Sequence, residues 1–206
     1  MKKVIVLLMA ICLCLAGCGS SAPETTTAAG ATTAAPETFD QFVDKYKRAS
    51  WDDMVVSPMA FFRDLHGLTL APIDQAFPDL ASLESTEESY GTVYTTDVVL
   101  FNRPIGVTIT DYGKFHGCSL SYKGDAAECY ADFQKMFESL IASEGDPWSL
   151  SVNSDDVDEV TFRKALVSGD LDQSLSAHWT EKKETGEYTT ALISYWNFTG
   201  GTLSFY

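Results

Sequence analysis

The chain has 206 residues, of which 45% are hydrophobic and 12% aromatic, enough for one folded domain with a real core. Its 29 acidic residues outnumber the 14 basic ones, giving a formal net charge of −15. This field repels phosphate backbones and anionic headgroups. The composition therefore argues against nucleic acid as a partner, and against a membrane surface recognised through basic residues.

The first residues are organised like an export signal. Lys2 and Lys3 precede an uninterrupted apolar run over residues 4–15. At about 1.5 Å per residue, a helix of this run is roughly 18 Å long, which is shorter than the ~30 Å hydrocarbon core of a bilayer. We therefore expect a cleaved signal peptide rather than a permanent span.

The apolar run ends in Leu15-Ala16-Gly17-Cys18. This tetrad resembles the lipobox of bacterial lipoproteins, in which small residues precede a cysteine that carries lipid. The resemblance implies diacylglyceryl transfer to the Cys18 thiol, cleavage between Gly17 and Cys18, and anchoring through that lipid at the outer face of the cell membrane. Two or more acyl chains on one residue hold a protein stably at a bilayer. Gly19 and the spacer after it favour a Gram-positive host.

The spacer is rich in Thr, Ala and Pro and has no aromatic residue. Such a composition buries too little surface to offset its ordering entropy. We predict three parts: a signal peptide over residues 1–17, the lipidated cysteine with a disordered linker over residues 18–38, and one globular domain over residues 39–206.

Helical periodicity opens the domain. It predicts a first short helix from Phe39 to Tyr46, a second over residues 58–66 that ends before Gly67, and a short third over residues 72–77. The most regular apolar stripe predicts a long helix over residues 125–143.

The acidic run that starts at Asn153 invites comparison with a calcium loop, but its spacing does not fit an EF-hand. We expect Asn153 to cap a further helix, with Asp155 and Asp156 in its first turn.

Alternating apolar residues predict two groups of strands. The first group covers residues 93–101, 105–110 and 115–122, and the second covers residues 175–182, 187–198 and 202–205. No crossover βαβ pattern is present. We predict an α+β fold, with an antiparallel sheet of about six strands in two three-stranded runs and helices packed on one face.

No catalytic motif, metal-ligand spacing or cofactor fingerprint occurs in the sequence. The three histidines, His66, His116 and His178, are not spaced as metal ligands, and we expect structural roles for them. We predict no catalytic residue, no metal and no cofactor.

Cys118 and Cys129 are the cysteines that remain after the leader and Cys18. Export permits a disulfide between them, and a helix folding back over the sheet would bring them together. The alternative is two reduced cysteines in the core. Both interpretations stay open at this point.

Aromatic residues gather in the strand over residues 187–198. Tyr188 and Trp196 share one face of this strand, and Tyr195 lies on the other. One face belongs to the core, and the other leaves a Tyr/Trp surface of the kind that binds proteins or carbohydrates.

These observations favour a non-enzymatic binding or accessory module of the cell envelope, whose partner is an envelope protein or a polysaccharide. Two alternatives stay open. A solute-capturing lipoprotein of a transporter usually has two α/β lobes, for which residues 39–206 are too few. A cell-wall hydrolase would need paired carboxylates, and no pair among the 29 acids is singled out.

Overall fold

The structure is a computed structural model that describes residues 38–183, 186–197 and 200–206. The predicted leader, Cys18 and nearly all of the predicted linker lie outside these residues. The helices are α1 (Phe39–Tyr46), α2 (Trp51–Val56), α3 (Met59–Leu70), α4 (Ile73–Ala76), the 3-10 helix η1 (Leu80–Ser82), α5 (Ala126–Glu144) and α6 (Glu159–Ser168). The strands are β1 (Glu84–Glu88), β2 (Gly91–Leu100), β3 (Arg103–Asp111), β4 (His116–Gly124), β5 (Ser149–Val152), β6 (Asp155–Asp156), β7 (Leu175–Lys183), β8 (Gly186–Trp196) and β9 (Gly201–Phe205).

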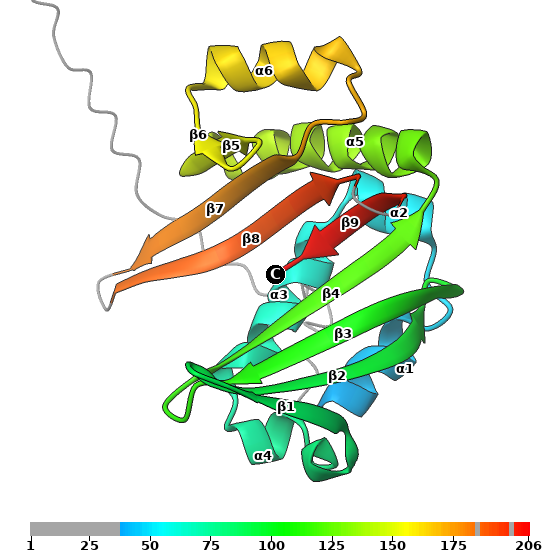
Figure 1. Cartoon of the computed structure of the whole chain (residues 1–206), viewed down its shortest axis with the longest axis vertical. Coiled ribbons are helices and arrows are strands. Elements are labelled where there is room, and N and C mark those ends of the chain that lie inside the picture. Colours follow the sequence, from blue (N-terminus) through cyan, green and yellow to red (C-terminus); the bar gives the residue numbers. More distant parts are fainter. Residues whose placement is uncertain (1–37, 184–185, 198–199) are drawn as a thin grey trace, which may run out of the picture. The chain divides into compact units, whose positions relative to one another are not determined.

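All nine strands form one open antiparallel sheet in the order β1-β2-β3-β4-β9-β8-β7-β5-β6 (Figure 1). The predicted α+β class and antiparallel sheet are confirmed, but the predicted number of strands is wrong. The six expected strands are present as β2–β4 and β7–β9. The sheet also contains β1 and β6, whose sequences are polar and fully exposed, and β5, whose alternation covers only four residues.

β9 joins the two groups of strands. On one side it pairs with residues 120–124 of β4, and on the other side with residues 193–196 of β8. β9 ends at Phe205, whereas β4 extends to His116 and β8 to Gly186. Beyond the end of β9 the sheet therefore divides into a β1–β4 arm and a β5–β8 arm, which diverge in Figure 1. We call the gap between them the split.

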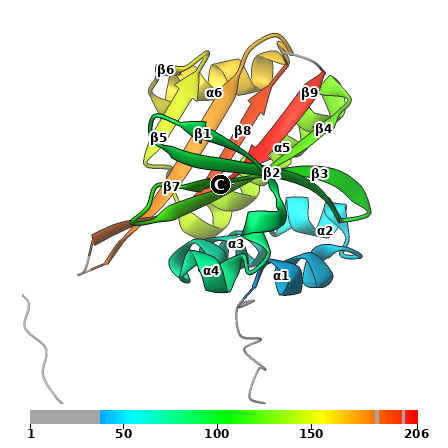
Figure 2. The same ribbon diagram turned by 60° about the horizontal axis from the view of Figure 1, so that its bottom comes forward.

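The core lies between the sheet and helices α2, α3 and α5 (Figure 2). On β9, the Phe205 ring contacts Trp51 of α2 and Phe61 of α3, at centroid distances of 6.1 and 5.6 Å. On β7, the Trp179 ring lies 5.8 Å from that of Phe137 in α5. α3 contacts both β4 and β8, so this helix underlies the split.

The first helix begins one residue after the predicted linker ends. Thr38 is its N-cap: the Thr38 hydroxyl accepts from the Gln41 N–H, and the Gln41 side chain accepts from the Thr38 N–H, each at 3.3 Å. This reciprocal capping box fixes the start of α1. The folded domain therefore includes Thr38.

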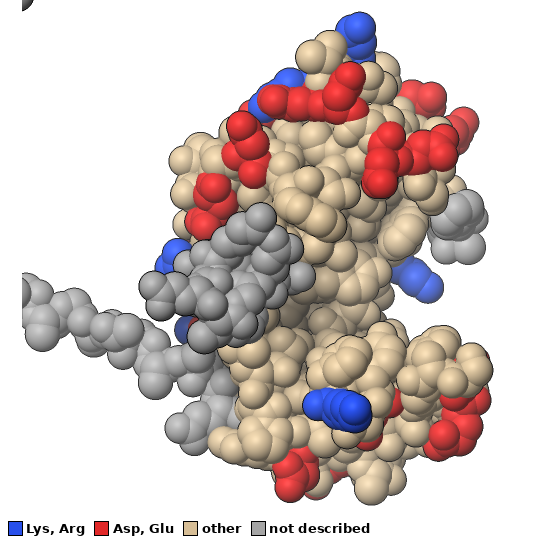
Figure 3. Space-filling view, turned by 90° about the vertical axis from the view of Figure 1, so that its left-hand side faces the viewer, with Lys and Arg blue, Asp and Glu red and all other residues tan. Residues whose placement is uncertain are grey.

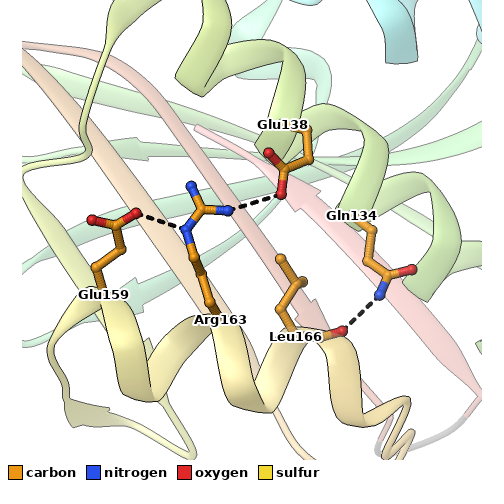
Figure 4. Close-up of polar contacts among 5 residues, drawn as sticks. All are labelled: Gln134, Glu138, Glu159, Arg163 and Leu166. Carbon is orange, nitrogen blue, oxygen red and sulfur yellow. Dashed lines mark hydrogen bonds and ion pairs between the residues drawn. The ribbon is translucent and has the colours of Figure 1, made fainter.

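α6 packs on α5 through polar contacts as well as Phe162 (Figure 4). The Arg163 guanidinium pairs with Glu159 at 2.6 Å and with Glu138 of α5 at 3.1 Å. The Gln134 amide of α5 donates to the Leu166 carbonyl at 2.6 Å. These contacts hold α6 along the outer side of α5.

Two predicted helix boundaries are wrong. Asn153 does not cap a helix: Asn153 and Ser154 have φ of 53° and 70° and form the turn between β5 and β6. Two consecutive positive φ values are typical of a type I′ hairpin turn, which Asn favours. Asp158 instead caps α6. The helix predicted to end before Gly67 continues to Leu70, because Leu68 is fully buried and offsets the weak helix propensity of glycine.

Candidate functional site

A pocket of about 420 Å³ lies at the split, within the ~300–1,000 Å³ usual for ligand sites. Figure 3 views the molecule from the side on which the arms diverge and shows a hollow in its surface. The described residues that line the pocket are Leu65, His66, Thr69, Thr108, Thr110, Tyr112, His116, Gly117, Cys118, Ser119, His178, Leu192 and Tyr206. We call this site the split pocket.

The described lining of the split pocket has no charged side chain, although the protein is acidic. None of its described lining residues is Asp, Glu, Lys or Arg. Its polar atoms are hydroxyls, imidazole nitrogens and backbone groups, contributed by both arms and by α3. In Figure 3 the visible surface of the hollow is largely tan, with acidic and basic side chains around it. Such a lining suits a neutral ligand that offers hydrogen-bond donors and acceptors.

The split pocket brings together all three histidines, which sequence analysis treated as scattered. His116, on β4, is 7% exposed, and its Nε2 donates to the Leu68 carbonyl at 3.0 Å. The Nδ1 of His66, on α3, lies 3.5 Å from the Thr69 hydroxyl. His178, on β7, meets the ring of Trp148 edge to face at 5.4 Å. No local spacing foretells this grouping, because each histidine comes from a different element.

The histidines do not form a metal site. Within the described part of the chain, no group of three or more His, Cys, Asp or Glu side chains is placed to hold a metal ion. Burial lowers the pKa of His178, so its ring is favoured in the neutral form. Neutral imidazoles can both donate and accept hydrogen bonds toward a ligand.

Cys118 lines the split pocket as a neutral thiol. It is 5% exposed, and burial raises its pKa to about 12. A nucleophilic cysteine requires a lowered pKa and some exposure, so Cys118 has the properties of a core residue. Burial likewise raises the pKa of Cys129 to about 11.

Cys118 and Cys129 are both free in this structure, so the candidate disulfide is not formed. A Cβ built on Gly201 would lie 2.9 Å from the Cβ of Cys129, and Gly201 pairs with Gly124. Cys129 therefore lies near Gly124, at the end of β4 opposite to Cys118. The two ends are roughly 20 Å apart by the strand rise, whereas the Cα atoms of bridged cysteines lie ~4.4–6.8 Å apart. In this structure Cys118 and Cys129 are therefore two reduced cysteines in the core.

Exposed aromatic side chains stand on both sides of the split pocket. On the β1–β4 arm, Tyr112 stacks on Phe115 with centroids 4.7 Å apart and lies 6.1 Å from Tyr90. On the β5–β8 arm, Trp148 contacts His178. Phe115 and Trp148 are 66% and 63% exposed. We call Tyr90, Tyr112, Phe115 and Trp148 the aromatic rim; exposed aromatics of this kind are frequent in binding sites.

Of the three aromatic residues considered for a surface on β8, Tyr195 belongs to the core. Tyr195 is fully buried, with its ring edge-on to Tyr130 and its hydroxyl donating to the Leu171 carbonyl at 3.0 Å. Trp196 is partly buried, and its indole N–H donates to the Ser204 hydroxyl at 3.3 Å. The side chain of Tyr188 lies outside the described part of the structure. Tyr195 is therefore a core residue, whereas Trp196 lies on the other face of β8 and is half-buried.

Comparisons with protein-family models, curated proteins and solved structures gave no match to this chain. Among the described residues, no helix combines the length and the apolar character needed to cross a bilayer. The site is therefore interpreted from its own geometry.

Proposed function

We propose that this protein is a lipid-anchored binding module at the outer face of the cell membrane, and that the split pocket with its aromatic rim is the binding site. The observation that carries the binding proposal is a concave pocket, flanked by exposed aromatics, whose described lining has no Asp, Glu, Lys or Arg side chain in a chain of net charge −15. Such a pocket offers hydrogen bonds and apolar contact to a neutral ligand.

The residues of the pocket favour binding over hydrolysis. Glycoside hydrolysis uses two carboxyl groups, and the described lining has none. Its one thiol, Cys118, has a raised pKa and is a poor nucleophile. A non-enzymatic module that captures an envelope protein or polysaccharide agrees better with this chemistry than a cell-wall hydrolase does.

The anchor proposal is supported by the lipobox-like tetrad that ends at Cys18. We expect the membrane-purified protein to begin at Cys18 and to carry diacylglycerol on that thiol, as measured by mass spectrometry of its N-terminal peptide. The Cys18→Ser variant should lack the lipid and leave the membrane fraction. Ser20→Ala, two residues away, is the control and should stay anchored. An unmodified Cys18 in the wild-type protein would refute the anchor.

A further inference from the structure

We infer that the ligand of the split pocket is an extended peptide, which adds as a strand to the open edge of β4. The inference rests on the proposed function, because it takes the split pocket as the binding site. It goes further by naming the ligand class and the backbone groups that recognise it.

Leu192 and Tyr206 exchange two backbone hydrogen bonds, of 3.3 and 3.1 Å. In an antiparallel sheet, successive residues direct their N–H and C=O groups to opposite neighbours. Tyr206 therefore faces β8, and Phe205 faces β4, where its partner is Leu120. This fixes which residues of β4 direct their backbone groups toward the β9 side.

The same alternation continues along β4 beyond the end of β9. Because Leu120 faces β9, Cys118 and His116 direct their N–H and C=O groups to the same side. On this side of β4, no described strand pairs with His116 or Cys118, because β9 pairs only with residues 120–124. The open edge thus offers two donors and two acceptors at the spacing of a β ladder. Open edges of this kind recognise extended peptides by strand addition.

An independent contact confirms this assignment. The Tyr112 N–H donates to the Phe115 carbonyl at 3.0 Å, so Tyr112 and Phe115 form a hydrogen-bonded pair of the β3–β4 hairpin. Hydrogen-bonded pairs recur at every second residue, so Gly117 and Ser119 also bond to β3 through their backbones. The intervening residues of β4 are then the ones that face the split.

The shape of the pocket matches a strand lying in the plane of the sheet. The lining includes the buried side chains of His116 and Cys118, on the helix side of β4, and also Gly117 and Ser119, on its other face. A pocket reached by both faces of one strand lies at that strand's edge. In the register that pairs Leu120 with Phe205, Tyr206 stands opposite Ser119, so the open edge is His116–Cys118; at about 3.3 Å per residue it accommodates a peptide core of about three to four residues.

The charge distribution defines the peptide further. The described lining has no charged residue, so the core of the peptide should be uncharged. Trp148 also borders a second pocket, which contains Asp146, Asp156 and Glu159. This acidic neighbourhood favours basic residues beside the core. A polysaccharide has no ladder of alternating N–H and C=O groups, so the open edge favours a peptide over it.

The test uses a synthetic library of hexapeptides with four randomised residues between two lysines, applied to the full-length lipidated protein in detergent micelles. We expect selection of uncharged, β-branched cores. The selected peptide should slow amide hydrogen exchange at Cys118 at least tenfold. The amides of Gly117 and Ser119 are internal controls and should change little, because they already bond to β3.

Two further measurements make the test specific. Two N-methylated forms of the selected peptide are compared, one modified at its odd residues and one at its even residues. Only one set of N–H groups faces β4, so one of the two forms should bind at least tenfold more weakly. Gly117→Val should weaken binding at least fivefold, because Gly117 lines the split pocket and the added methyl groups would occupy part of it. The new Cβ itself meets only a Tyr112 ring carbon at 3.8 Å, and an unchanged circular dichroism spectrum checks that the fold is kept. Ser151→Val, on β5, is the matched control and should bind normally.

The outcomes separate this inference from the proposed function. If no library peptide protects the Cys118 amide, or if neither N-methylated form is weakened, strand addition is overturned. If chitohexaose protects the pocket residues and no peptide does, strand addition is overturned while the proposed binding function stands.

Discussion

Asp64 is a buried carboxylate that ties α1 to α3. Its Oδ2 accepts from the Tyr46 hydroxyl at 2.7 Å and forms an ion pair with Lys45. Burial, followed by the hydrogen bond to Asp64, raises the pKa of Tyr46, so the hydroxyl stays protonated and continues to donate. The network lies directly beneath the aromatic contacts of Tyr46 with Phe61 and Phe101.

Asp64→Ala should lower the free energy of unfolding by about 2–4 kcal/mol, because Tyr46 and Lys45 lose their shared acceptor in a partly buried place. Urea unfolding followed by circular dichroism measures the change. Glu84→Ala, on the exposed strand β1, should change it by less than about 0.5 kcal/mol. Equal stabilities of the two variants would show that the network does not hold α1 on α3.

His178 makes stability depend on pH. Burial lowers its pKa below the usual histidine value of about 6.5, so the unfolded chain binds the proton more readily than the folded one. The stabilisation is therefore complete above the unfolded pKa and is lost as the pH falls from that value toward the lowered one.

We expect His178→Gln to lose less stability than the wild type between about pH 7 and pH 5, where histidine titrates. Thermal unfolding midpoints at both pH values give the shift for each protein. Subtracting the shift of the variant from that of the wild type removes the contribution of the other titrating groups. Identical pH dependence in the two proteins would contradict a lowered pKa at His178.

At the scale of elements, the close approach of β9 to α5 depends on Gly201. A Cβ at this position would lie 2.6 Å from the Ala126 Cα and 2.9 Å from the Cys129 Cβ. Both neighbours belong to the first turn of α5, where little movement is available. Gly201 therefore allows β9 to pass under α5 and to pair with β4.

Gly201→Ala should lower the free energy of unfolding by about 1–3 kcal/mol through overpacking. Gly117→Ala is the matched control, because its new Cβ makes only an ordinary contact, 3.8 Å from a Tyr112 ring carbon. Chemical denaturation of both variants compares them. A Gly201→Ala protein as stable as Gly117→Ala would mean that β9 and α5 separate without cost.

The elements that sequence analysis predicted correctly have local patterns. α5 has a long apolar stripe, and β2–β4 alternate between short turns, so residues near in sequence suffice to define them. β1 was missed because its sequence, ESTEE, is polar throughout and is held only by pairing with β2. Asn153 suits both a helix cap and a positive-φ turn, and the pairing of β5 with β6 decides for the turn.

The split pocket could not be predicted, because it arises from pairings between distant strands. His66, His116 and His178 meet only because β9 joins β4 to β8 and then ends. The buried face of β8 could not be predicted for a similar reason. Alternation puts Tyr195 on one face of β8, but only the arrangement of the strands and α5 places that face against Tyr130.

At the scale of the whole molecule, we propose an acidic domain that carries the split pocket and is attached to the membrane by a lipid on Cys18. The excess of acidic residues disfavours contact with anionic headgroups and keeps the domain soluble beside a bilayer. Attachment through one lipidated residue would then leave the split pocket accessible to a partner at the cell surface.

Site-specific photo-crosslinking in living cells tests the binding site most directly. A photoreactive phenylalanine analogue is placed at Tyr112 on the aromatic rim or, as the control, at Val167, which is 78% exposed on α6. We predict that irradiation joins the Tyr112 protein to one envelope component and that the Val167 protein gives no such product. No adduct at Tyr112, or the same adducts at both positions, would contradict the assignment of the split pocket as the binding site.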